Sequence, residues 1–97
     1  MFDPRKEIEE QKKILRRMHY QPIISKLAYL KLKKEWAKLT KNMSPYERIK
    51  YWASFFNQRY AKAYFEVALE LSKKLNLPID HLVNPETIKK WKEKGII

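Results

Sequence analysis

The stretch "PYERIKYWASFFNQRYAKAYFEVALELSKKL" (residues 45–75) decides the fold. It contains no glycine, and its only proline is its first residue, so nothing inside it interrupts a helix. Ser44 is a good N-cap, Pro45 suits the first helical position, and Glu47 completes a capping box with Ser44. The stretch therefore predicts one long helix of roughly 45 Å.

Apolar side chains lie on more than one side of this predicted helix. The main face comprises Ile49, Trp52, Ala53, Phe56, Tyr60, Ala63, Val67 and Leu71. A second set, Tyr51, Phe55, Phe65 and Leu69, lies well off that face. A helix that is apolar on two sides packs on two sides. Either other helices of the chain surround it, or Tyr51, Phe55 and Phe65 meet a second copy or a larger protein partner.

Prolines divide the rest of the chain. Asp3-Pro4 and Asn84-Pro85 pair a capping residue with a helix-starting proline, whereas Gln21-Pro22 and Leu77-Pro78 mark weaker starts. We predict helices at 4–19, 22–41, 45–75 and 85–94, with a short turn at 78–83. The predicted fold is all-α: residues 1–97 form a single domain, a compact bundle of four helices around the long third one.

The charge balance points to a polyanionic partner. Lys and Arg number 22 against 11 Asp and Glu, which leaves a net charge of +11. Such a surface attracts nucleic acid first, and acidic membranes or proteins after it. Lysine-rich chains with little Gly and no Cys are also typical of thermophile proteins, although there Glu usually rises together with Lys.

Residues 22–41 concentrate this charge. Ala28, Tyr29, Leu32, Trp36 and Leu39 fall on one predicted face, and the opposite stripe is formed by Lys31, Lys34, Lys38 and Lys41. Glu35 is the only acid in this segment. The stripe is either a solvated face or a row of phosphate contacts, to which Arg16 and Arg17 would add. The two arginines also suit the negative end of the predicted helix 4–19.

The C-terminal segment has two interpretations. Asn84 caps a helix, Gly95 suits the left-handed position after it, and Ile88 with Trp91 forms a narrow apolar edge, so the segment is explained as a docked terminal helix.

The sequence "TIKKWKEKGII" (residues 87–97) also resembles the recognition-helix segment of MerR-type and excisionase-type helix-turn-helix proteins. That resemblance implies a C-terminal helix-turn-helix unit in which Thr87, Lys89 and Lys90 face DNA while Ile88 and Trp91 pack inward.

Most enzyme chemistry lacks the residues that it needs. His19 and His81 lie far apart, no Cys is present, and a single glycine cannot build a phosphate-binding loop. No segment has the roughly 18 apolar residues of a membrane span, and the acidic N-terminus does not resemble a signal peptide. We therefore expect a cytoplasmic protein that is not an enzyme and uses no metal or cofactor.

The expected function is binding of nucleic acid, with double-stranded DNA first and in a regulatory or architectural role. Two alternatives remain open: an RNA-binding protein, and a helical accessory subunit of a larger nucleic-acid-processing complex.

Overall fold

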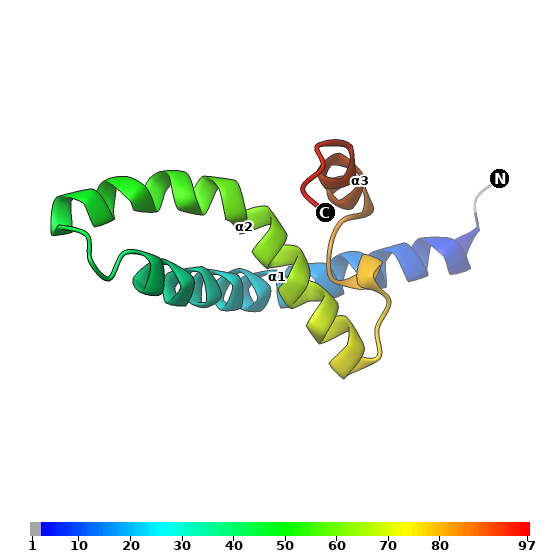
Figure 1. Ribbon diagram of the computed structural model, residues 1–97. Coiled ribbons are helices and arrows are strands. Elements are labelled where there is room, and N and C mark those ends of the chain that lie inside the picture. Colours follow the sequence, from blue (N-terminus) through cyan, green and yellow to red (C-terminus); the bar gives the residue numbers. More distant parts are fainter. Residues whose placement is uncertain (1–2) are drawn as a thin grey trace.

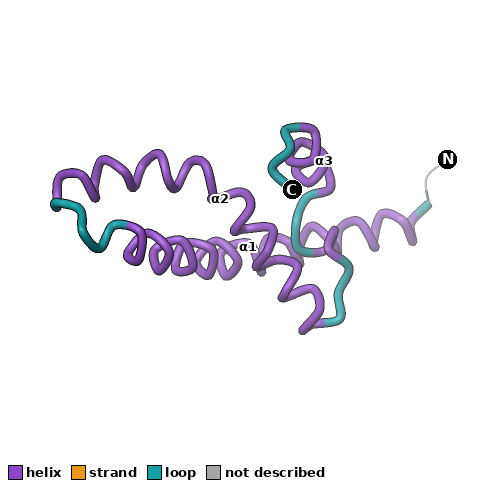
Figure 2. The backbone as a smooth tube through the Cα atoms, in the orientation of Figure 1, coloured by secondary structure: helices purple, strands orange, loops and turns teal. Residues whose placement is uncertain are grey.

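The computed structural model describes residues 3–97, all of whose regular elements are helical (Figure 1). Helix α1 spans Pro4–Leu39, α2 spans Pro45–Leu75, a short 3-10 helix η1 spans Ile79–His81, and α3 spans Pro85–Glu93. The first two helices run antiparallel and form a hairpin closed by residues 40–44, and α3 lies near the place where they cross (Figure 2). The prediction of an all-α chain is confirmed.

The number of helices differs from the prediction. The two helices expected at 4–19 and 22–41 form one helix of 36 residues, with Pro22 inside it, so three α-helices are present in the described chain and not four. Pro22 has no N–H to donate to the Met18 carbonyl, which costs about 3 kcal/mol. The helix continues because its next turns bury Ile24, Ala28 and Leu32. Each large aliphatic side chain buried there contributes about 1.5–3 kcal/mol, which offsets the proline.

The molecule is elongated, so the predicted compact bundle is wrong. Its principal extents are 61 × 26 × 18 Å, and its radius of gyration is 16.8 Å, whereas a compact chain of this length has about 12.5 Å. The reason is the unbroken α1, which alone is about 54 Å long. Its first half projects past the crossing with α2 (Figure 1). Lys13 Nζ lies 3.3 Å from Asp80 Oδ2, which fastens this half to η1.

The core lies between the two arms of the hairpin and the segment before α3. It comprises Ile24, Ala28, Leu32, Phe55, Ala63, Val67, Ala68, Leu82 and Val83. Phe55 is only 1% exposed, so it packs within the chain and cannot contribute to the predicted partner surface. Ile49, expected in the core, is 73% exposed. Spacing alone does not fix the rotation of a helix that is apolar on several sides.

A polar network closes the hairpin and fixes its end. Trp36 Nε1 donates to the Arg48 carbonyl at 3.1 Å, and the fully buried Thr40 donates its hydroxyl to the Trp36 carbonyl at 2.6 Å. Arg48 Nε donates to Thr40 Oγ1 at 3.3 Å, and its guanidinium lies 4.8 Å from the Trp36 ring centroid. Because Thr40 caps α1, the helix ends at Leu39 and not at residue 41 as predicted.

The terminal helix forms and docks as its sequence predicts. Asn84 Oδ1 accepts from the Glu86 N–H at 2.9 Å, and Gly95 has φ +71°. The Ile96 N–H donates to the Trp91 carbonyl at 2.9 Å, which is the backbone bond of a Schellman cap. The Trp91 ring packs edge-on against Phe65, with centroids 6.3 Å apart. Phe65, assigned to a partner surface, is therefore half-covered by α3 of the same chain.

Candidate nucleic-acid interface

Three of the predicted phosphate-binding lysines form an exposed stripe near the closed end of the hairpin. We call Lys34, Lys38 and Lys41 the outer lysine stripe; all three are exposed. Lys34 and Lys38 are one helical turn apart, about 6 Å along α1, and Lys41 follows the buried cap Thr40. No carboxylate within residues 3–97 lies within 4.0 Å of any of these ammonium groups.

Lys31, the fourth predicted member, has a different role. Its Nζ lies 2.6 Å from Glu66 Oε2 on α2, and this hydrogen bond raises the pKa of Lys31. Glu35, the only acid of residues 22–41, lies 3.4 Å from Arg59 of α2. The ion pairs of this segment therefore link the two arms of the hairpin, and they leave the outer lysine stripe uncompensated.

Arg16 and Arg17 do not join the stripe. Arg17 lies 17 residues before Lys34, which is about 26 Å along a continuous helix. Arg16 Nη1 lies 2.7 Å from His81 Nδ1. Since a guanidinium only donates, Arg16 is the donor of this contact. Arg17 lines a cavity between α1 and α3.

The residues singled out on α3 point in different directions. Thr87 is half-buried and lines the same cavity as Trp91, whereas Lys89 and Lys90 are exposed. At 100° per residue, Lys89 lies about 200° around the helix from Thr87. The three residues therefore do not form one surface.

The segment before α3 does not have the geometry of a helix-turn-helix. That motif joins two helices by a turn of about three or four residues. Here residues 76–84 separate α2 from α3 and contain only the three-residue η1. The expected C-terminal helix-turn-helix unit is absent from residues 76–93.

The closed end of the hairpin also carries an exposed aromatic residue and a lysine that were not predicted to belong to the site. Tyr46 is 76% exposed in the first turn of α2, one turn before the exposed Lys50. An exposed aromatic ring beside a cation suits stacking on a base. The exposure of Tyr46 could have been predicted from its position directly after Pro45, at the predicted helix start. Side chains of a first turn point toward the N-terminal end of the helix, where fewer neighbours cover them.

Within residues 3–97, no helix is both long and apolar enough to cross a bilayer. Comparison of the chain with protein-family models, with curated proteins and with solved structures gave no match.

Proposed function

We propose that this protein binds nucleic acid through the closed end of its α1–α2 hairpin, with duplex DNA as the expected ligand. The observation that supports the proposal is the outer lysine stripe, whose three exposed ammonium groups have no acidic partner in residues 3–97. The whole chain carries +11. Lysines that neutralise phosphates release condensed counterions, and this release supplies most of the affinity of sequence-independent binding.

The spacing of the stripe suits a phosphate backbone. Lys34 and Lys38 are separated by about 6 Å along α1, whereas each DNA strand carries one charge per 3.4 Å of axis. Like charges along one edge repel each other in the free protein, since no acid interleaves them at i,i+4. A polyanion removes that repulsion. The Trp36–Thr40–Arg48 network holds the helix end in place, so little backbone order is lost on binding.

Fluorescence anisotropy with labelled duplex DNA, single-stranded DNA and RNA of one sequence tests the proposal at about 50 mM salt. We expect the duplex to bind, and Lys34→Ala with Lys38→Ala to weaken binding on every sequence. The matched control is Lys73→Ala with Lys74→Ala, which removes the same charge from exposed positions at the far end of α2. If no duplex binds, or if both double variants weaken binding equally, the hairpin end is not the interface. Tighter binding of RNA would favour the RNA alternative.

A separate experiment addresses α3. The exposed pair Lys89 and Lys90 is changed to Ala, and binding is compared on several duplex sequences. A changed preference among sequences would show that α3 contacts bases, whereas an equal change on all sequences would limit it to phosphate contact.

A second candidate function rests on a different surface. Ile23, Leu27 and Leu30 are exposed at i, i+4 and i+7 on α1, well away from the side that packs on α2. Such a stripe suits the apolar face of a partner helix, as expected of an accessory subunit. It replaces the partner surface predicted at Tyr51, Phe55 and Phe65. Sedimentation of the protein and of Leu27→Gln tests self-association, and a monomer at every concentration would count against a homodimer.

A further inference from the structure

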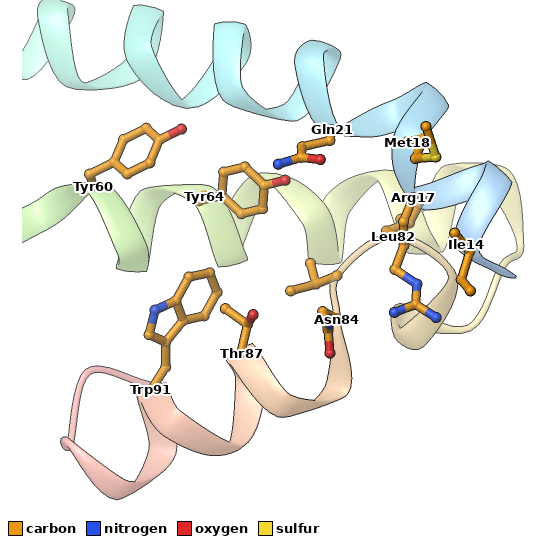
Figure 3. Close-up of a pocket in the computed structure, with 11 residues that line it drawn as sticks. Ile14, Arg17, Met18, Gln21, Tyr60, Tyr64, Leu82, Asn84, Thr87 and Trp91 are labelled. Carbon is orange, nitrogen blue, oxygen red and sulfur yellow. The ribbon is translucent and has the colours of Figure 1, made fainter.

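A cavity of about 500 Å³ lies between the projecting half of α1 and helix α3, with α2 beside it (Figure 3). Its walls are mainly apolar and include Ile14 and Met18 of α1, Tyr64 of α2, Leu82, and Trp91 of α3. The volume lies within the roughly 300–1,000 Å³ of small-molecule sites, which are mostly apolar with a few polar groups that orient the ligand. Neither the outer lysine stripe nor the exposed stripe of Ile23, Leu27 and Leu30 lines this cavity.

Among the described residues that line the cavity, Arg17 is the only charged one. Its Nε lies 3.4 Å from the Lys13 carbonyl, a long hydrogen bond, and no carboxylate of residues 3–97 lies within 4.0 Å of its guanidinium. The neighbouring charges are already engaged, because Lys13 pairs with Asp80 and Arg16 bonds to His81. Arg17 therefore offers a half-buried cation to the cavity without an anion to balance it.

Neutral donors also face this space. Figure 3 shows the Tyr64 hydroxyl and the Gln21 amide directed toward each other, and both residues line the cavity. Neither group has a hydrogen-bond partner within the described residues, whereas the Tyr60 hydroxyl is bonded to Ser25 Oγ at 2.7 Å. The cavity thus combines an apolar wall, one uncompensated cation and free neutral donors.

We infer that this cavity binds an aliphatic carboxylate. The hydrocarbon chain lies against Ile14, Met18 and Trp91, and the carboxylate pairs with the Arg17 guanidinium, which can bind it through two parallel N–H groups. The net charge of +11 favours an anionic ligand. The same charge disfavours a second copy of the chain in this place. Free fatty acids and membrane lipids share an acyl chain with an anionic end, and the experiment below separates them.

Calorimetric titration of the 97-residue chain with decanoate, octanoate and decanol tests the inference. Decanoate should bind about fifteenfold more tightly than octanoate, since each of its two additional buried methylenes contributes roughly fourfold in affinity. Arg17→Gln should lower the affinity for decanoate about tenfold to a hundredfold, because a charge-assisted hydrogen bond is lost. It should leave the affinity for decanol unchanged. Arg5→Gln is the matched control, because Arg5 is an exposed arginine of α1 that does not line the cavity. It should leave the affinity for decanoate unchanged.

Met18→Trp provides an independent variant. Met18 is exposed at the cavity, so the larger ring fills the space without disturbing the core. It should abolish binding of both decanoate and decanol while the helical circular dichroism stays unchanged. Equal affinity of decanoate for the wild type and for Arg17→Gln would overturn the inference. Binding to vesicles that contain phosphatidylserine, without binding of free decanoate, would overturn it in favour of a membrane surface.

Discussion

Replacing Pro22 by alanine tests whether α1 is one helix. The proline lies inside α1, it is exposed, and it makes no contribution to the core. Alanine restores an N–H that can donate to the Met18 carbonyl and removes the ring that crowds it. The substitution should therefore stabilise the fold.

Two opposing contributions determine how much Pro22→Ala changes the free energy of unfolding. Proline in a helix interior costs about 3 kcal/mol relative to alanine. The unfolded chain gains freedom when a proline is removed, which costs roughly 0.4–1 kcal/mol. The net gain is about 2 kcal/mol, and for a chain of this size the Tm should rise by roughly 8–16 °C.

Thermal unfolding followed by circular dichroism measures this shift. Pro45→Ala is the control, because Pro45 stands at the first position of α2, where a missing N–H costs nothing. The control should leave the Tm unchanged or slightly lower. If Pro22→Ala behaves like the control, α1 is broken at residue 22, as the sequence alone predicts.

Three further predictions concern packing and pH. Phe55→Ala should lower the free energy of unfolding by about 3–5 kcal/mol in urea titrations, because it empties a fully buried aromatic site; a loss below about 1 kcal/mol would contradict its place in the core. Trp91→Ala should remove hydrogen-exchange protection from α3 while the hairpin keeps its own, and loss in both would show that α3 is needed for the whole fold. The pKa of Lys31 is raised by its hydrogen bond to Glu66, and burial raises the pKa of Tyr64. Both groups therefore lose their protons at a lower pH in the unfolded chain than in the folded chain. Their contribution to the free energy of unfolding is fully present below about pH 10 and is lost as the pH rises through the folded pKa values. Urea midpoints that rise over this range would contradict the assignment.

The helix ends could be predicted from the sequence because their causes are local. Asp3 Oδ1 accepts from the Arg5 N–H at 3.0 Å, and Ser44 Oγ accepts from the Glu47 N–H at 3.3 Å. Each bond joins residues two or three positions apart, so the residue types alone indicate it. The left-handed Gly95 follows from the same kind of local signal.

The arrangement of the helices depends on contacts that the sequence pattern does not contain. Pro22 carries a local signal to stop, and the burial of Ile24 and Leu32 against α2 overrides it. Phe55 and Ile49 are equally apolar by type, yet the rotation of α2 buries the first and exposes the second. Two apolar faces of one helix have the same sequence pattern, and contacts with the other helices decide which face is buried.

In the candidate site, too, local features could be predicted from the sequence and contacts between distant residues could not. The exposure of Lys34, Lys38 and Lys41 was predictable from helical spacing. The pairing of Lys31 with Glu66 was not, because 35 positions separate them in the sequence. The stripe of four lysines therefore becomes a stripe of three plus one structural ion pair.

The salt dependence of duplex binding tests the central claim most directly. Each phosphate neutralised adds about −0.9 to the slope of log affinity against log salt, so the outer lysine stripe should contribute about −2.7. Removing Lys34 and Lys38 together should make the slope shallower by about 1.8, whereas the Lys73 and Lys74 control should keep the wild-type slope. An unchanged slope in the Lys34 and Lys38 variant, or no binding of duplex at the lowest salt, would contradict the assignment of the hairpin end as the phosphate-binding surface.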